Sequence, residues 1–118
     1  MKHSTIFRLA LAGLLAAPAT VALAAQPMMY EESVARHEES RIIQSPIGGI
    51  ENSKWYDYRI NVTETQKELA SDLRHSTDIE DQRDAWGEYA HELKDNRQHY
   101  VKAMEKKGYR VPRVYFED

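Results

Sequence analysis

One amphipathic pattern, from residue 78 to residue 107, constrains the fold of this chain more than any other feature. Apolar side chains recur along it every seven residues, at Ile79, Trp86, Leu93 and Tyr100. That spacing keeps them on one face of an α-helix. Ser76 or Thr77 is the expected N-cap, because Thr77-x-x-Glu80 is typical of a capping box, and Gly108 stands where a helix C-terminus favours glycine. The pattern predicts a helix about 45 Å long.

The preceding segment, 53–75, permits two interpretations. An apolar stripe at helical spacing runs through Trp55, Tyr58, Val62, Leu69 and Leu73. Residues 54–62 also alternate as a strand would, and Thr63-x-x-Gln66 resembles a capping box at which a shorter helix would begin. We favour one long helix with Asn52 or Ser53 as its N-cap, because the stripe continues across Thr63.

Two such helices joined at residues 75–77 predict an all-α fold built on a long antiparallel hairpin over residues 53–108. Counting outward from the turn sets Leu73 beside Ile79 and Tyr58 beside Leu93, with Leu69 beside Arg83 and Trp86 and Val62 beside Ala90. A lone hairpin has one apolar seam and buries little surface. It therefore needs a third element or a second copy of the chain, as in a homodimer.

The segments on either side of the hairpin give weaker signals. Residues 25–52 contain sparse apolar positions in a charged stretch, which predicts a short helix, and then the breaker cluster 44–49, which predicts a loop. Residues 109–118 are aromatic and basic, and Pro112 disfavours a helix there. We expect an extended tail that packs on the hairpin or meets a partner.

Residues 1–24 are typical of a cleaved signal peptide. Lys2 and Arg8 lie before an apolar stretch. The stretch ends in Ala22-Leu23-Ala24, a small-x-small site that predicts cleavage before Ala25. A transmembrane anchor is the alternative, but Pro18 interrupts the stretch and a spanning helix needs about 20 apolar residues. We therefore expect an exported, periplasmic protein with no membrane insertion of the mature chain.

Composition narrows the function classes. The chain of 118 residues has no cysteine, which excludes disulfides, thiolate metal sites and a catalytic thiol. Lys2 and Arg8 leave with the signal, so 14 Lys and Arg remain against 19 Asp and Glu, a formal charge of −5. A basic excess normally marks proteins that bind nucleic acid, and this acidic balance argues against such a partner.

No motif for catalysis stands out. The sequence lacks G-x-S-x-G, S-x-x-K and a Gly-rich phosphate loop, and we expect neither an enzyme nor a bound cofactor. The aromatic positions Trp55, Tyr58, Trp86, Tyr89 and Tyr100 form a stripe that fits either the core of a thin bundle or an exposed binding groove.

Four residues form a candidate metal-binding stripe on the second helix. Glu88 and His91 are three residues apart, Asp95 follows four residues later and His99 four after that. Helical spacing sets the four on one face, where carboxylate and imidazole groups are suitable metal ligands. An ordinary solvated helix face explains the same pattern, and we assign no metal site from the sequence.

One short segment resembles a known family. Val62-Thr63-Glu64-Thr65-Gln66 is similar to the L-T-x-x-Q pentad of the Spy/CpxP family. That family consists of small, periplasmic, all-helical, Cys-free stress proteins that dimerise and hold unfolded chains on a concave surface. The resemblance implies a chaperone-like protein. Here valine replaces the leucine, the pentad occurs once and the chain is acidic, so no functional residue is carried over.

Taken together, these features predict a small, non-catalytic periplasmic helical protein that binds protein or peptide partners, with a stress or chaperone-like role as its most concrete form. Two alternatives stay open. One is a metal-binding helical module, and the other is a structural subunit of an envelope complex that docks through residues 109–118.

Overall fold

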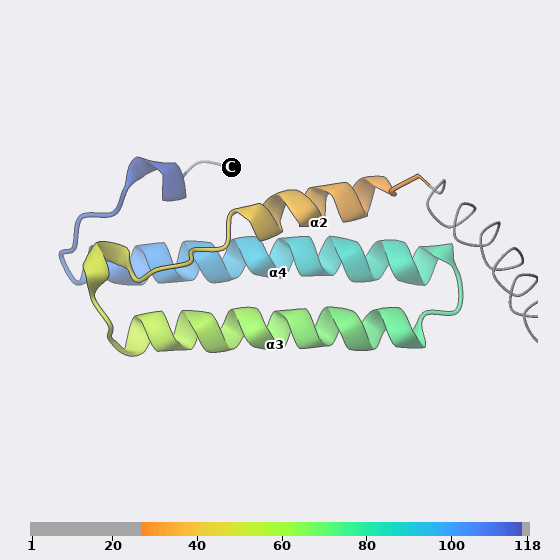
Figure 1. The fold of residues 1–118 in the computed structure, drawn as a ribbon, viewed down its shortest axis with the longest axis horizontal. Helices are drawn as coiled ribbons and strands as arrows, with labels where there is room; N and C mark the ends of the chain where they lie inside the picture. Colours follow the sequence, from red (N-terminus) through yellow and green to blue (C-terminus); the bar gives the residue numbers. More distant parts are fainter. Residues whose placement is uncertain (1–26, 117–118) are drawn as a thin grey trace, which may run out of the picture.

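The computed structural model describes residues 27–116, which form an α-helical hairpin with a shorter helix packed against it (Figure 1). Its elements are α2 (Tyr30–Ser40), the 3₁₀ turn η1 (Ile47–Gly49), α3 (Ser53–His75), α4 (Ile79–Lys106) and the 3₁₀ turn η2 (Arg113–Tyr115). The described part contains no strand, which confirms the all-α prediction, and none of its helices is long and apolar enough to cross a membrane. The predicted signal peptide lies outside the described residues.

Helix α3 is continuous across the segment that the sequence left ambiguous. Its N-cap is Asn52, whose Oδ1 accepts a hydrogen bond from the backbone N–H of Trp55 at 3.1 Å. Thr63 lies inside the helix and donates its hydroxyl proton to the carbonyl of Arg59 at 3.0 Å. The strand interpretation of 54–62 is therefore wrong, and the capping box at Thr63 is not used.

The start of α4 differs by one residue from the prediction. The N-cap is Asp78, whose carboxylate accepts from the N–H of Asp81 at 2.8 Å. Asp81 in turn accepts from the N–H and the hydroxyl of Thr77, at 3.0 and 2.9 Å. These bonds lower the pKa of Asp81 below its usual value. The N-cap is therefore neither Ser76 nor Thr77. The acidic side chain that bonds back to the residues before the helix is Asp81, and the predicted capping box between Thr77 and Glu80 does not form.

The end of α4 follows the prediction closely. Gly108 adopts a φ of 91°, which favours glycine, and its N–H bonds the carbonyl of Glu105 at 2.8 Å. The N–H of Tyr109 reaches back to the carbonyl of Met104 at 3.1 Å. This pair of bonds is a Schellman motif, which satisfies the last free carbonyl groups of the helix.

The register of the hairpin differs from the one obtained by counting outward from the turn. Tyr58 stacks on Tyr100, with ring centroids 4.9 Å apart, and Asn96 donates to the hydroxyl of Thr65 at 3.1 Å. Both contacts lie several residues further along α4 than expected. The reason is that Ser76 and Asp78 are extended and that the first turn and a half of α4 is exposed. Ile79, expected in the seam beside Leu73, is accordingly 57% exposed.

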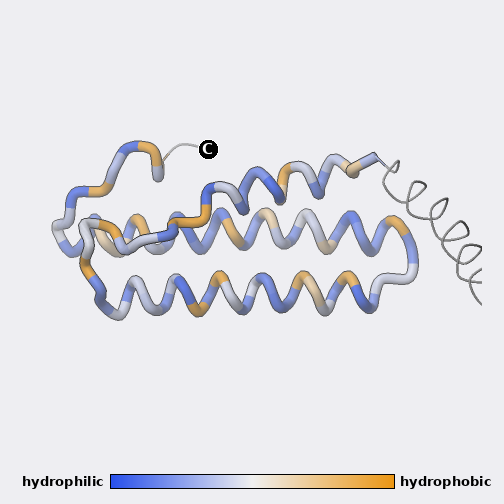
Figure 2. Tube along the Cα trace, viewed as in Figure 1, coloured by the Kyte–Doolittle hydropathy of each residue, from blue (hydrophilic) through white to orange (hydrophobic). Residues whose placement is uncertain are grey.

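Helix α2 is the third element that the hairpin requires, and it packs against α4 (Figure 1). It contributes one fully buried apolar side chain, Ala35, and is otherwise polar along most of its length (Figure 2). Polar contacts hold it instead. Glu38 accepts from Arg97 at 2.7 Å, with both side chains buried, and Tyr89 donates to Glu39 at 2.7 Å. Burial and the neighbouring Glu39 carboxylate raise the pKa of Tyr89, so this hydroxyl keeps its proton.

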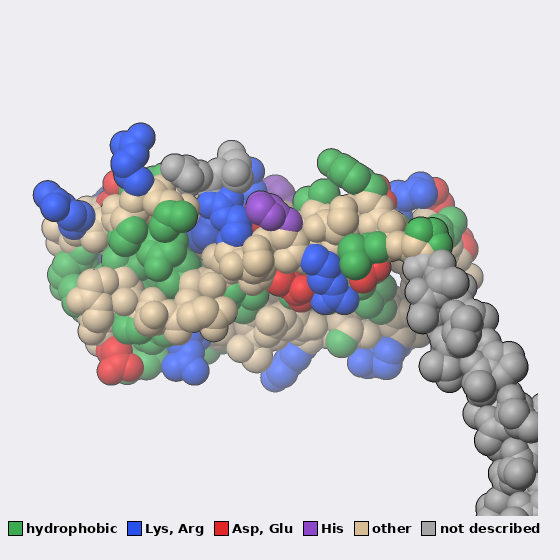
Figure 3. Space-filling model, turned by 45° about the horizontal axis from the view of Figure 1, so that its top comes forward, with side chains coloured by type: hydrophobic (Ala, Val, Ile, Leu, Met, Phe, Trp, Pro, Cys, Tyr) green, Lys and Arg blue, Asp and Glu red, His purple; other side chains and the backbone are tan. Residues whose placement is uncertain are grey.

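The linker and the tail close one end of the molecule. Ile43 and Ile47 of the linker are buried in the core, and so is Val111 of the tail. Arg41 donates to the carbonyl of Val114 at 3.1 Å, which ties the two segments together. Hydrophobic side chains gather at this end in Figure 3. The tail is thus not extended throughout, because η2 forms a turn within it after Pro112.

Candidate functional site

The aromatic stripe predicted from the sequence is the core of the fold. All five of its members are 3–7% exposed: Trp55, Tyr58, Trp86, Tyr89 and Tyr100. The ring of Tyr58 stacks on that of Tyr100 in the seam between α3 and α4. The ring of Trp55 packs against Tyr100, with the two centroids 5.8 Å apart. In this conformation the stripe offers no exposed aromatic groove to a partner.

Two of these tyrosines also anchor the linker. The hydroxyl of Tyr58 accepts from the N–H of Ile43, and the hydroxyl of Tyr100 accepts from the N–H of Ile47, each at 2.9 Å. Burial raises the pKa of both phenols. Their polar atoms satisfy buried backbone groups, so their role in the described structure is to position the chain between α2 and α3.

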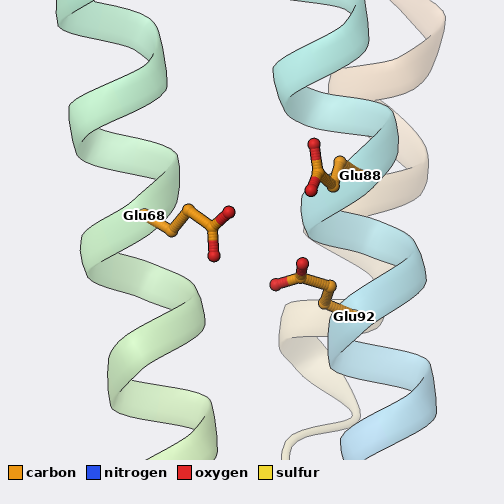
Figure 4. Close-up of side chains that lie close together, drawn as sticks. All are labelled: Glu68, Glu88 and Glu92. Atoms are coloured by element: carbon orange, nitrogen blue, oxygen red, sulfur yellow. The ribbon is translucent and has the colours of Figure 1, made fainter.

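The structure does not bring the predicted metal stripe together. His91 and Asp95 form a pair, with Nε2 and Oδ2 3.3 Å apart, and their side chains are 74% and 48% exposed. His99 lines a separate depression with Asn96 and Tyr100. Glu88 turns toward α3 (Figure 4). The four share a side of α4, but helical spacing alone does not set their ligand atoms on a common point.

Glu88 has different neighbours. Carboxylate oxygens of Glu68, Glu88 and Glu92 lie within 4.8 Å of one another, Glu68 reaching from α3 toward the other two on α4 (Figure 4). Burial is the main cause that raises the pKa of Glu92, and the charges of Glu68 and Glu88 raise it further. Glu68 thus faces two carboxylates of like charge across the seam between α3 and α4.

The cluster lies within a longer polar depression along the seam. Toward the turn the depression is lined by Asp72, His75, Ser76, Asp81, Asp84, Ala85 and Glu88. A narrow pocket that includes Thr65, Asp72, Glu88 and Glu92 connects this end to the cluster. We refer to Glu68, Asp72, Asp84, Glu88 and Glu92 as the acidic groove. It offers carboxylate oxygens to a cationic ligand, and it contains no nucleophile paired with a base.

Sequence reasoning identified one of the five groove residues, Glu88. The other acidic positions on α4 were visible as i, i+4 neighbours, and Glu68 and Asp72 have the same spacing on α3. Their convergence depends on the hairpin register, which counting from the turn gave incorrectly. No family model, no curated protein and no solved structure matches this chain.

Proposed function

We propose that this chain is a small, exported, non-catalytic helical protein that binds a basic segment of a protein or peptide partner in the acidic groove. The observation that carries the proposal is the set of facing carboxylates Glu68, Glu88 and Glu92. Apolar or oppositely charged side chains at these positions would stabilise the hairpin, whereas like charges oppose its closure. A ligand that brings positive charge relieves this repulsion.

The form of the groove favours a peptide side chain over a small anion or an apolar ligand. Acidic residues are spread along the seam from Asp84 to Glu92, so one extended basic segment contacts several of them in succession. Charge complementarity of this kind steers association and sets specificity, and it makes the affinity dependent on salt. A periplasmic location, inferred from residues 1–24, is part of the proposal.

A direct titration tests the proposal. We expect a fluorescein-labelled oligo-lysine peptide to bind the mature protein at low ionic strength, and an oligo-glutamate peptide of equal length not to bind. The variant Glu88→Gln/Glu92→Gln is expected to weaken binding at least fivefold. The matched control Glu105→Gln removes one charge from an exposed position of α4 outside the groove, and its binding is expected to match that of the wild type. Equal binding by the double variant and the wild type contradicts the proposal.

A chaperone-like role is the most concrete version of partner binding. The aromatic stripe is buried in this conformation, and the proposal assigns the capture of an unfolded client to the acidic groove. We therefore expect the protein to suppress the aggregation of a basic client, such as reduced lysozyme, more strongly than that of an acidic client, such as reduced α-lactalbumin. No effect on either client at severalfold excess contradicts the chaperone version and leaves peptide binding to be judged by the titration.

The second candidate function is binding of a divalent cation. Carboxylate oxygens of Glu68, Glu88 and Glu92 lie within 4.8 Å of one another, and this favours a cation site there. The site differs from the stripe of Glu88, His91, Asp95 and His99 considered from the sequence. Oxygen ligands without imidazole suit Ca²⁺ or Mg²⁺ better than Zn²⁺. Calorimetry with each ion, on the wild type and on Glu68→Gln, separates this function from peptide binding, because only a metal site predicts saturable binding of the free ion.

The third candidate, a structural subunit that docks through residues 109–118, gains one feature from the fold. Val111 is buried and Tyr115 packs against the core, while Val114 and Phe116 point outward at 60% and 47% exposure. Deletion of residues 114–118 followed by comparison of captured partners tests it.

A further inference from the structure

The outer face of α3 carries a second feature, separate from the acidic groove. Six side chains line a shallow groove along this face, namely Tyr56, Arg59, Ile60, Thr63, Glu64 and Lys67. Their spacing of three and four residues keeps them on one side of the helix, away from the seam. Tyr56 and Ile60 are 48% and 58% exposed, so the face presents apolar surface between charged side chains.

A stripe spaced by three and four residues along a helix is mirror-symmetric about its midpoint. The positions of these six residues are mirrored about a point midway between residues 61 and 62. When a second α3 lies antiparallel on the first, with a two-fold axis through that point, each of the six faces another of the six. Tyr56 then lies opposite Lys67, Arg59 opposite Glu64, and Ile60 opposite Thr63.

We propose that this face is the contact surface of an antiparallel homodimer, with a second copy of the chain as its occupant. The chemistry of the facing residues is complementary at every position. Two Arg59–Glu64 ion pairs form, one on each side of the axis, and each Lys67 ammonium faces the ring of a Tyr56. Each Ile60 packs against the Thr63 of the other copy beside the axis. A surface that complements itself in this way is the requirement of a two-fold interface.

The charge distribution along the hairpin supports the antiparallel direction independently of the groove residues. Residues 68–95, near the turn, include nine acidic and three basic side chains. Residues 96–113, at the open end, include six basic and one acidic. An antiparallel contact sets the basic end of each copy beside the acidic half of the other, whereas a parallel contact sets like charges together.

The size of the contact sets the expected strength. The groove spans residues 56–67, about 17 Å of helix. One helix pair of this length buries less surface than the standard interface of roughly 1,600 Å². We therefore expect a weak dimer, with a dissociation constant of about 10 μM to 1 mM. The surface lies on the side of α3 opposite the seam, so this inference stands or fails separately from the proposed peptide binding.

A charge exchange tests the ion pairs. Sedimentation equilibrium on the mature chain should show a monomer–dimer equilibrium that Arg59→Glu weakens at least tenfold, because the carboxylate introduced at position 59 then faces Glu64 of the other copy. The variant Arg59→Glu/Glu64→Arg restores opposite charges across the axis and is expected to recover dimerisation to within about threefold of the wild type. Lys102→Glu makes the same charge change on an exposed position of α4 outside the facing pairs. It alters only the longer-range charge balance, and it should weaken the dimer by less than about threefold.

The absence of cysteine permits a second test, of register. A single Thr63→Cys lies close to its own copy across the axis and should form a disulfide-linked dimer under mild oxidation. A single Lys67→Cys lies about 16 Å along the helix from its own copy and should not. A chain that stays monomeric to 1 mM overturns the proposal. A dimer whose charge exchange gives no recovery, or in which both cysteine variants cross-link equally, overturns this surface.

Discussion

The buried ion pair between α2 and α4 gives the sharpest prediction about stability. Arg97 Nη1 and Glu38 Oε2 are 2.7 Å apart, and the two side chains are 2% and 9% exposed. Glu38→Ala leaves the guanidinium group buried without its carboxylate, and the Nε of Arg97 already lacks a hydrogen-bond partner in the described structure. Removing one partner of a buried pair costs about 3–5 kcal/mol. Alanine favours the helix, so helix propensity does not add to this cost.

That cost is large for a domain of this size. At about 0.05–0.15 kcal/mol per residue, the 90 or so described residues have a free energy of unfolding of about 4–13 kcal/mol. Urea unfolding, followed by circular dichroism, should show the midpoint of Glu38→Ala lowered by about 2–3 M, for a typical slope of about 1.5 kcal/mol per M. Glu32→Ala removes only a partly exposed i, i+4 pair with Arg36, and we expect it to cost less than about 0.5 kcal/mol.

The double variant Glu38→Leu/Arg97→Met separates the stranded charge from lost packing. Apolar replacement of both partners removes the uncompensated charge, and similar replacements elsewhere are close to neutral or stabilising by about 1–4 kcal/mol. We expect the free energy of unfolding of the double variant to be at most about 1 kcal/mol below that of the wild type, or above it. If Glu38→Ala costs less than about 1 kcal/mol, α2 is not held by this pair. If the double variant is as unstable as the single one, the cost comes from packing.

Three further predictions concern single residues. Asn52→Ala should lower the free energy of unfolding by about 1 kcal/mol, because it removes the N-cap of α3. Thr63→Ala should change this free energy by less than about 0.5 kcal/mol, because Thr63 lies inside the helix. Urea unfolding of both variants shows which residue caps the helix. Gly108→Ala should cost about 1 kcal/mol in the same assay, since alanine at a φ of 91° is strained. The pKa of Glu92 is raised in the folded state, so the folded protein binds this proton more tightly than the unfolded chain does. The free energy of unfolding should therefore fall as pH rises through the interval between the unfolded and the folded pKa. Unfolding measured from about pH 4 to pH 8 should show a smaller fall for Glu92→Gln.

The helices could be predicted because their signals are local. The apolar stripe of 78–107 and Gly108 define α4 from the sequence alone, and the continuous stripe through Val62 identifies α3 as one helix. The capping residues could not be assigned to better than one position, because Thr77 and Asp78 are adjacent and both are good caps. Asp81 decides between them by bonding back to Thr77.

The arrangement of the helices could not be predicted in the same way. Counting residues outward from the turn assumes that both helices begin level with each other, and α4 instead begins past the end of α3, with Ile79 exposed. The docking of α2 depends on Glu38 and Arg97, which are 59 residues apart in the chain. The acidic groove depends on the same register, so the sequence pattern of one helix includes Glu88 but does not place Glu68 beside it.

The two long helices contribute unequally to the buried core. Nine of the 28 residues of α4 are buried, against four of the 23 residues of α3. Helix α4 packs against both α2 and α3, so two of its sides contribute to stability. Helix α3 packs through one stripe, which leaves Glu68 free to face the groove on one side and Ile60 free to face outward on the other. Both proposed binding surfaces therefore use α3, because it is the helix on which side chains can serve a partner at little cost to the core.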